Sequence, residues 1–395
     1  MNYTAYRHTL AETLARSELP FSADEYEARL SKVRAAMERQ DLGALLLTDP
    51  ADINYLTGYH TFEVSVHACL VCTAQRLVLQ VASIETGAAV VTARADDILG
   101  YRWENPDEVI DPLCDLLTPC ERVGIDGWHA GLRQGVMAAL TARLGAERFQ
   151  EAGALLDAIR IVKSDAELAC LRESARITSA GLEAAMAAIR PGVTDNEVAA
   201  EGARALLAAG GEFMSLQPIV TSAERISVIH VNHKRRVIAA GDPVFLEFGA
   251  AYQRYTAPMM RTAIAGQASH EMQAVADLCR ELYEVLCRHM LPGETFDAAA
   301  RAAEAVLSGW QETLFHSGVF GYAVGAQFPP SWVEGTGYIA SGQARCFEAG
   351  MVFHLPLCLR LPGRWGIGLS DTVMVTEHGG VALTDNDWRL RELLA

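Results

Sequence analysis

The spacing of apolar residues along the first third of the chain switches between a helical period and short continuous runs. Over residues 22–40 the large apolar side chains recur every three or four positions, which predicts a helix. Apolar runs bounded by polar turns predict strands at 44–47, 68–71 and 77–79, and a further helix is expected over 132–144. This alternation is typical of a small α/β domain.

Two Pro-Gly breaks divide the rest of the chain into similar halves. Pro191-Gly192 ends one long helical pattern, and Pro292-Gly293 ends another about 100 residues later. Proline disfavours helix before it, and glycine accepts the left-handed turn that ends a helix. An Ala- and Leu-rich helical pattern follows each break, and strand-like segments follow at 243–255 and 350–376. A chance pair of breaks is the alternative, but the matching flanks favour a duplicated α-α-β-β unit with a cleft between its copies.

The junction between the two parts is predicted near residues 160–164, although no linker rich in Pro, Gly or Ser marks it. Ser164 and Glu167 have the spacing of a capping box, which predicts the start of a long helix. We therefore expect an α/β (α+β) fold, with an N-terminal α/β domain over residues 1–162 and the duplicated domain over 163–395.

Composition and charge narrow the classes of partner. The 395 residues include 33 Lys and Arg against 49 Asp and Glu, a formal net charge of −16. The basic cluster at 234–236 is too short to bind a phosphate backbone, so no nucleic-acid partner is expected. No apolar run reaches the roughly 18–20 residues of a membrane span, and the N-terminus lacks a signal-peptide pattern. A soluble, cytoplasmic protein with no membrane partner is the expectation.

The nine cysteines do not form a metal-binding or disulfide pattern. Cys69 and Cys72 look like half of a zinc site, but no second pair follows at the required spacing. Both fall in a predicted strand, where residues three apart point to opposite faces. Reduced core cysteines are the favoured interpretation. The chain also lacks the Gly-x-Ser-x-Gly elbow of serine hydrolases and a phosphate-binding loop.

The chain resembles the pita-bread enzymes, a family that includes prolidase, aminopeptidase P, creatinase and ectoine hydrolase. Several short motifs carry the resemblance, in the family's order and over nearly the whole length. They are Asp49-Pro50, Asn54–Tyr59, Arg160–Ser164, Gly249–Tyr252, Arg261-Thr262, Gly350–Phe353, Asp371-Thr372 and Val375-Thr376.

The resemblance implies that the family's metal ligands are missing. Metal-dependent members hold two divalent ions with two Asp, one His and two Glu, and these positions fall here on Glu247, Pro258, Tyr322, Pro356 and Ser370. Proline offers no side-chain donor, and Ser and Tyr are poor ligands for hard divalent ions. A single carboxylate cannot hold a dinuclear centre, so no metal and no cofactor are expected.

Within the family, the metal-free creatinase and ectoine hydrolase branch is the more similar, and ectoine hydrolase the nearer of the two. It shares the Glu at 247, the Arg254-Tyr255 pair and a Gly-Tyr-x-x-Gly stretch that continues to Pro-Pro-x-Trp-x-Glu. The sequence departs from it over 365–371, where ectoine hydrolase is acidic, and this leaves ectoine itself in doubt. The resemblance implies hydrolysis of a C–N bond in a small amidine- or guanidino-like, or cyclic amidine, compound.

His230 and Glu247 are the expected catalytic residues. His230 falls where creatinase and its relatives keep their catalytic imidazole, and a neutral histidine can move protons at pH 7. Glu247 interrupts an apolar strand, where charged side chains are rare unless they are paired or functional. It could hold a cationic amidine or attack its carbon. The alternative for His230 is an ordinary half-exposed histidine on a strand. The alternative for Glu247 is a structural ion pair, for instance with Arg261.

Five further residues are expected to bind substrate. Tyr322, on a glycine-bounded loop, could donate to an oxyanion or simply pack. His354 could donate to a substrate carboxylate or assist proton transfer, or it could be a core histidine bonded to a backbone carbonyl. Glu334 and Tyr255 belong to stretches shared with ectoine hydrolase, and a solvated loop carboxylate is the alternative for Glu334. His67 could reach a partner's cleft in the family's homodimer, or be an ordinary strand histidine.

Two other functions remain open at this point. One is a metal-dependent Xaa-Pro peptidase with rearranged ligands, and the other is a non-catalytic pita-bread module that binds peptides or proteins. Retention of His230 and Glu247 argues against the module, because binding alone needs neither. The expected partners are a small-molecule substrate and a second copy of the chain.

Overall fold

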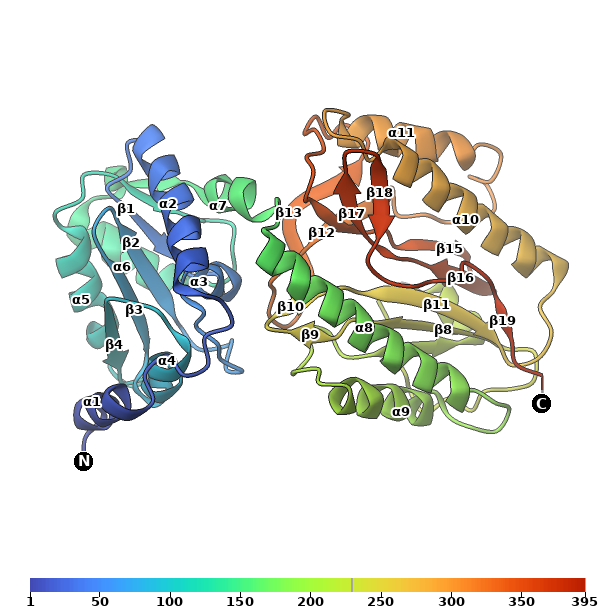
Figure 1. Cartoon of the computed structure of the whole chain (residues 1–395), viewed down its shortest axis with the longest axis horizontal. Helices are drawn as coiled ribbons and strands as arrows, with labels where there is room; N and C mark the ends of the chain where they lie inside the picture. The colour runs from blue at the N-terminus through green and yellow to red at the C-terminus, as the bar shows by residue number, and fades with distance from the viewer. Residues whose placement is uncertain (229, 395) are drawn as a thin grey trace. The chain divides into compact units, whose positions relative to one another are not determined.

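The computed structural model describes residues 1–228 and 230–394. The chain divides into two compact units, Met1–Ile159 and Arg160–Ala395, each with its own sheets and helices (Figure 1).

The first unit is built on a mixed six-stranded sheet in the order β4-β3-β2-β1-β5-β6. Its strands are β1 (Ala44–Leu47), β2 (Cys69–Thr73), β3 (Leu77–Ala82), β4 (Asp97–Tyr101), β5 (Val123–Ile125) and β6 (Phe149–Glu151). Its helices are α1 (Tyr3–Thr13), α2 (Ala23–Arg39), α3 (Pro50–Thr57), α4 (Thr86–Thr92), α5 (Asp107–Leu117), α6 (Gln134–Leu144) and α7 (Gly153–Arg160). The predicted α/β character and the predicted elements of this unit are confirmed.

The two cysteines of β2 lie on opposite faces of this sheet. Cys72 packs in the core cluster that contains Val33 and Met37 of α2, whereas Cys69 packs with Leu113 of α5 and Leu140 of α6. Both thiols are buried and free. The period of two residues along a strand therefore separates them, as expected, and they do not form half of a metal site.

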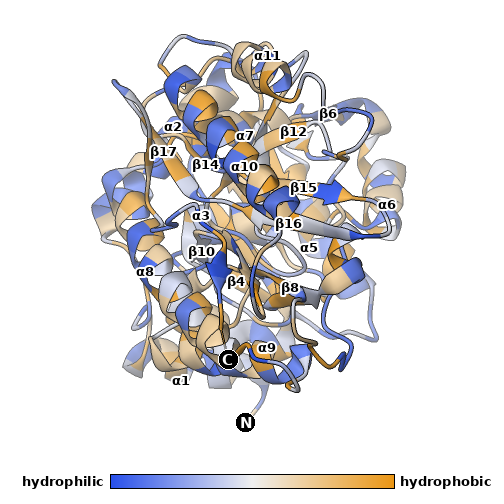
Figure 2. Ribbon diagram, turned by 90° about the vertical axis from the view of Figure 1, so that its right-hand side faces the viewer, coloured by the Kyte–Doolittle hydropathy of each residue, from blue (hydrophilic) through white to orange (hydrophobic). Residues whose placement is uncertain are grey.

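The second unit contains the predicted duplication of a helix pair followed by strands. The first pair is α8 (Asp165–Ala188) and α9 (Asp195–Ala208), and the second is α10 (His270–His289) and α11 (Phe296–Val306). Figure 1 shows the strands of this unit lying between the two pairs. Hydrophilic and hydrophobic residues are mixed along α10 in Figure 2, as expected of a helix with one face on the core.

Local capping sets where these helices begin. Ser164 starts α8 with a complete capping box to Glu167, and Thr194 starts α9 in the same way with Glu197. Thr295 caps α11 by accepting a hydrogen bond from the amide of Ala298, without the reciprocal glutamate. The breaks before α9 and α11 each contain a glycine with positive φ, Gly192 at 93° and Gly293 at 89°.

The strands of the second unit form two larger sheets and two hairpins. The four-stranded sheet has the order β19-β11-β8-β7, and the five-stranded sheet has the order β13-β12-β14-β17-β18. The first comprises β7 (Ile219–Ser222), β8 (Pro243–Phe248), β11 (Met259–Ile264) and β19 (Arg391–Glu392). The second comprises β12 (Val319–Val324), β13 (Val333–Ala340), β14 (Val352–His354), β17 (Thr372–Thr376) and β18 (Gly379–Ala382). The hairpins are β9 (Ala251–Tyr252) with β10 (Tyr255–Thr256), and β15 (Leu357–Leu361) with β16 (Trp365–Leu369).

Hydrogen bonds along β11 join the two halves of this unit. The Met260 amide donates to Ser370 Oγ at 2.6 Å, and the Ser370 amide donates to the Met260 carbonyl at 3.2 Å. Thr262 Oγ1 donates to the carbonyl oxygen of Gly368 at 2.9 Å. The end of β16 is therefore held against the middle of β11, which places Ser370 within the interior.

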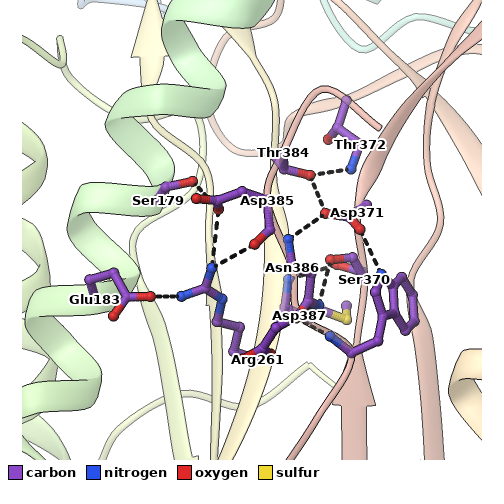
Figure 3. Close-up of polar contacts among 12 residues, drawn as sticks. Ser179, Glu183, Arg261, Ser370, Asp371, Thr372, Thr384, Asp385, Asn386 and Asp387 are labelled. Atoms are coloured by element: carbon purple, nitrogen blue, oxygen red, sulfur yellow. Dashed lines mark hydrogen bonds and ion pairs between the residues drawn. The ribbon is translucent and has the colours of Figure 1, made fainter. Parts of the chain in front are cut away.

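Arg261 of β11 is a structural residue. It forms an ion pair with Glu183 of α8, and its Nη2 lies 3.1 Å from Asp385 Oδ1 (Figure 3). Arg261 stands opposite Leu246 in the β8–β11 register, so its side chain leaves the sheet on the opposite face from Glu247. The alternative in which Glu247 is the ion-pair partner of Arg261 is therefore wrong.

Asp371 anchors the C-terminal segment beside this network. Its carboxylate accepts hydrogen bonds from Thr384 Oγ1 at 2.6 Å and from the Asn386 amide at 3.1 Å, as Figure 3 shows. Trp388 Nε1 also donates to it, at 2.8 Å. Burial raises the pKa of Asp371 to about 6 despite these bonds.

Glu334 lies on β13 in a buried ionic cluster at the start of the second unit. Lys163 Nζ donates to Glu334 Oε2 at 2.7 Å and to the carbonyl of Arg160 at 2.6 Å. Thr336 Oγ1 donates to the same carboxylate at 2.8 Å, and Arg160 Nη2 lies 3.6 Å from its other oxygen. The alternative of a solvated loop carboxylate is wrong, because the segment before α8 and β13 enclose Glu334 together.

Removing the ammonium group of Lys163 should destabilise the protein strongly. Lys163→Met leaves a buried carboxylate without its nearest cation, so the free energy of unfolding in urea should fall by about 3 kcal/mol. The double variant Lys163→Met/Glu334→Leu should recover most of this loss, because two apolar side chains replace the ion pair. Arg176→Ala, which removes an exposed pair with Glu173, is the control and should destabilise the protein far less, because solvent screens this pair. An equal loss in the single and double variants would contradict this account.

Candidate active site

Glu247 is a buried carboxylate in the middle of the four-stranded sheet. It lies on β8 between Ile219 of β7 and Met260 of β11, and only 9% of the residue is exposed. Within residues 1–228 and 230–394, no hydrogen bond or ion pair reaches its side chain. Burial raises the pKa of Glu247 to about 7, and the positive charge of Arg360 opposes this rise only in part.

The surroundings of Glu247 are apolar. Phe245, two residues earlier on β8, faces the same side of the sheet and packs with Ile226, Met260 and Cys358. The pKa of the Cys358 thiol is raised to about 11 by burial, and the negative charge of Glu247 adds to this rise. Loss of solvation on burial is the main physical cause of the raised pKa of Glu247.

A chain of hydrogen bonds runs through the interior beside Glu247. Trp332 Nε1 donates to the hydroxyl of Tyr322 at 2.9 Å, and that hydroxyl lies 2.7 Å from His354 Nδ1. His354 Nε2 lies 2.6 Å from Ser370 Oγ, which accepts the amide hydrogen of Met260 at 2.6 Å. Tyr322 and His354 are directly paired across β12 and β14.

Tyr322 is the member of this chain of hydrogen bonds that lies near Glu247. It lies on β12 and not on a loop, so the predicted setting of this residue is wrong. Burial holds the pKa of its hydroxyl well above the usual range, and the charge of Glu247 raises it further. The two side chains are therefore close enough to interact electrostatically, although they come from different sheets of the unit.

His354 is enclosed completely and cannot meet a substrate directly. Its exposed fraction is 0%, and each ring nitrogen lies beside a hydroxyl group. Burial lowers the pKa of His354 to about 3, so the ring is neutral. Direct donation to a substrate carboxylate is ruled out by this geometry. The alternative of a backbone carbonyl partner is also wrong, because the partners are Tyr322 and Ser370.

His230 lies exposed in the loop between η3 (Ala223–Ser227) and β8. Its φ of 55° is in the left-handed region, where histidine is more frequent than most residues. Asn232 anchors the following part of the loop, because its Oδ1 accepts the amide hydrogen of Val220 at 2.9 Å. No hydrogen bond or ion pair joins His230 to Glu247 in the described parts of the chain.

In the described ranges, no hydrogen bond or ion pair joins the remaining predicted residues to Glu247 or His354. Tyr255 is buried on β10, and its hydroxyl donates to Glu167 Oε1 at 2.9 Å. Glu334 is held by Lys163 as described above. His67 is buried in the first unit, just before β2, where burial lowers the pKa of its ring to about 4.

Sequence reasoning missed three residues that shape this site. From the sequence, Ser370 is recognisable only as a poor metal ligand and Trp332 only as part of a motif, although both hold the Tyr322–His354 chain. Arg360 of β15 donates from Nε to the carbonyl of Ile226 at 3.2 Å and supplies the positive charge near Glu247. The sequence carried no signal for Arg360, because its position depends on how β15 packs under η3.

The donors at the family's ligand positions do not fit a dinuclear metal centre. Pro258 and Pro356 offer no side-chain donor, and the hydroxyls of Tyr322 and Ser370 are engaged with His354. Among residues 1–228 and 230–394, no group of three His, Cys, Asp or Glu side chains is arranged to hold a metal ion. In the same ranges, no helix is long and apolar enough to cross a membrane.

Comparison with known proteins accounts for both units. Residues 29–162 match the Creatinase/Prolidase N-terminal domain, and residues 169–377 match Metallopeptidase family M24. The ectoine hydrolase of Halomonas elongata is 26% identical over an alignment of 399 positions, which covers 93% of this chain and 97% of that protein. The Xaa-Pro dipeptidase of Pyrococcus furiosus is 22% identical over 93% of this chain and 99% of its own length.

Solved structures show the same fold. The prolidase from Pyrococcus horikoshii superposes with a TM-score of 0.81 at 21% identity, over 93% of this chain and 100% of that one. The X-Pro aminopeptidase from Thermotoga maritima gives 0.80 at 20% identity, over 92% and 99% of the two chains. The predicted arrangement, a creatinase-like N-terminal domain followed by a pita-bread domain, is confirmed. Since the M24 match alone spans more than half of the sequence, the chain belongs to metallopeptidase family M24, and its likeness to ectoine hydrolase fits the creatinase and ectoine hydrolase branch.

Proposed function

We propose that this M24-family hydrolase acts without a metal ion on a C–N bond of a small amidine- or guanidino-like compound. The observation that carries the proposal is Glu247, a buried carboxylate with no ionic or hydrogen-bonding partner in the described ranges and a pKa raised to about 7. Buried charges without partners are costly, so such a group is typical of a site that a ligand completes. The similarity to ectoine hydrolase supports the same class of reaction.

An amidinium or guanidinium ion would supply the hydrogen-bond donors and the positive charge that the carboxylate of Glu247 lacks. It is planar and cationic, and its N–H groups can donate two parallel hydrogen bonds to one carboxylate. Its positive charge would lower the pKa of Glu247 and hold the ionised form. The carboxylate would then either orient the cation for attack by water or attack its carbon directly.

The other residues have roles consistent with this chemistry. The hydroxyl of Tyr322 would donate to the atom that gains negative charge when the C–N bond is attacked. His230 would take a proton from water and return it to the leaving nitrogen, once substrate or loop movement brings it to the site. Glu334 and Tyr255 would contribute by holding buried segments of the same unit in place. A homodimer, with His67 near the partner's cleft, completes the proposal.

The first experiment is a substrate screen. Purified protein is incubated with ectoine, creatine and related amidines, and separately with Xaa-Pro dipeptides, and products are followed by mass spectrometry. Turnover of an amidine without turnover of the dipeptides supports the proposal. Selective cleavage of Xaa-Pro dipeptides would instead favour a peptidase with rearranged ligands.

Chelators should leave the activity unchanged. Pro258, Pro356, Tyr322 and Ser370 supply no anionic ligand, so EDTA should not lower kcat on the substrate found in the screen, and purified protein should contain substoichiometric Mn, Zn and Co. A metal-dependent prolidase treated in parallel shows that the chelation is effective. Loss of activity in EDTA with recovery on adding Mn²⁺ or Zn²⁺ would overturn the metal-free mechanism.

Glu247→Gln should stabilise the protein at alkaline pH. The pKa of Glu247 is about 7 in the fold against an ordinary value of 4.5, so the folded state binds this proton more tightly than the unfolded chain. The resulting stability is present below pH 4.5 and is lost as the pH rises through 7. The difference in unfolding free energy, variant minus wild type, should therefore rise by about 3 kcal/mol between pH 4.5 and pH 8.

Chemical denaturation at both pH values measures this difference. Glu377→Gln removes one negative charge from an exposed residue and controls for net charge. A difference for Glu247→Gln that is no larger than the control's would show that Glu247 has a partner in solution.

His230 and Glu247 should act as one catalytic unit. His230→Ala and Glu247→Gln should each lower kcat by at least about 10²-fold, and the double variant should be little slower than either single one. His233→Ala, three residues along the same loop, is the matched control and should retain most of the activity. A folded Glu247→Gln protein within about threefold of the wild-type rate would show that this carboxylate is structural.

A further inference from the structure

We infer that Ser370, acting through His354, fixes the hydroxyl of Tyr322 as a hydrogen-bond donor toward the Glu247 site. Ser370 would then be a positioning residue for the reaction proposed above. The inference rests on the polarity of the four hydrogen bonds that link Met260, Ser370, His354, Tyr322 and Trp332. Two of these bonds have donors that cannot be reversed, and they determine the direction of the other two.

The first fixed donor is the backbone amide of Met260. It donates to Ser370 Oγ at 2.6 Å, which occupies one lone pair of that oxygen. Ser370 is fully buried, and its own hydroxyl hydrogen needs an acceptor. Among the described residues the partner within reach is His354 Nε2, at 2.6 Å. Ser370 therefore donates to Nε2, and this nitrogen carries no hydrogen.

The neutral ring of His354 then has its hydrogen on Nδ1. A neutral imidazole holds one hydrogen, and its two nitrogens have opposite roles. The burial that keeps His354 uncharged makes this rule strict at ordinary pH. Nδ1 consequently donates to Tyr322 Oη, at 2.7 Å.

The second fixed donor is the indole of Trp332. Its Nε1 has a hydrogen and no acceptor lone pair, so it donates to Tyr322 Oη at 2.9 Å. The phenolic oxygen now accepts two hydrogen bonds, from Trp332 and from His354. Its own hydrogen has no acceptor among the described residues, so it is free to point toward the site that Glu247 shares.

The opposite polarity leaves a buried hydrogen unsatisfied. If Nε2 of His354 donated to Ser370, the serine oxygen would accept two bonds, and its hydroxyl hydrogen would have no acceptor among residues 1–228 and 230–394. Tyr322 would donate to Nδ1 and would offer the substrate only a lone pair. Either polarity leaves one hydroxyl hydrogen without an acceptor among the described residues, on Tyr322 or on Ser370. Ser370 is fully buried whereas Tyr322 is only half-buried, so the structure favours the polarity that leaves the free donor on Tyr322.

This direction of the hydrogen bonds restricts which kind of substrate atom can lie opposite Tyr322. The substrate atom opposite Tyr322 must be an acceptor, such as a carbonyl oxygen, an amidine nitrogen that gains charge, or the oxygen added at the attacked carbon. A substrate with an N–H or O–H donor at that point would be disfavoured. Ser370 thus contributes to specificity although it touches no substrate.

Nitrogen NMR tests the polarity without any substrate. In protein labelled with ¹⁵N-histidine, protonated and unprotonated ring nitrogens have well-separated shifts, and the His354 signals are identified by their loss in His354→Gln. The expected result is an unprotonated Nε2 and a protonated Nδ1 in the wild type. Ser370→Ala should change this to the other tautomer or to a mixture. A protonated Nε2 in the wild type would overturn the inference, whatever reaction the protein catalyses.

A kinetic cycle tests the route through Tyr322. Ser370→Ala should lower kcat at least tenfold in the wild-type background but less than about twofold in the Tyr322→Phe background, where the hydroxyl is absent. Ser370→Thr retains a hydroxyl and should restore much of the rate. An equal loss in both backgrounds would show that Ser370 acts only on the structure.

Ser174→Ala is the matched control for this cycle. The Ser174 hydroxyl is equally buried, accepts the amide hydrogen of Ala257 at 2.8 Å and donates to the carbonyl of Ala250 at 2.6 Å. Its removal reproduces the loss of a buried hydroxyl without touching His354. Its effect on kcat should be the same with Tyr322 or Phe at position 322. If no compound in the screen is turned over, the proposed function fails, while the NMR result still decides the polarity.

Discussion

The candidate site depends on one constraint: the carboxylate of Glu247 is buried in a sheet without an ionic or hydrogen-bonding partner in the described ranges, and this costs free energy. Phe245, which faces the same side of β8 as Glu247, packs with Met260 and Cys358, and burial raises the pKa of Glu247 to about 7. Such a group is unfavourable for folding, so the rest of the second unit must supply the stability that retains it. The hydrogen bonds along β11 and the network of Arg261 and Asp371 do this by holding the two halves of the unit together.

A hydrogen-bonded chain of uncharged groups occupies the interior beside Glu247. In the resemblance to metal-dependent relatives, Tyr322 and Ser370 occupy positions of two ligands, and both now contact His354. A histidine with a pKa of about 3 carries no charge, and two hydroxyls bring none. Among residues 1–228 and 230–394, Arg360 is the cation whose charge acts on Glu247, and no ion pair with the carboxylate is formed.

Contacts within the chain changed the interpretation of several predicted residues. Glu334 was recognised by its motif, but the ammonium group of Lys163 lies beside it and both are buried, so its first role is structural. His354 was recognised as a polar residue in an apolar strand, yet its nitrogens face two hydroxyls and no open space. In both cases the residue type correctly indicated an unusual environment. The side chains that contact Glu334 and His354, which the sequence did not identify, determine what that environment is.

The sequence by itself determined the local elements and the duplicated plan of this protein. Capping boxes at Ser164 and Thr194, the Pro-Gly breaks and the apolar periods act over a few residues, so they can be recognised without the fold. Only the tertiary structure decided the site. Tyr322 and His354 are 32 residues apart, and His354 and Ser370 are 16 apart, and they meet through strand pairing between distant segments. The raised pKa of Glu247 likewise depends on the tertiary structure. Desolvation is set by every side chain packed around the carboxylate, and the local sequence alone does not show which side chains these are.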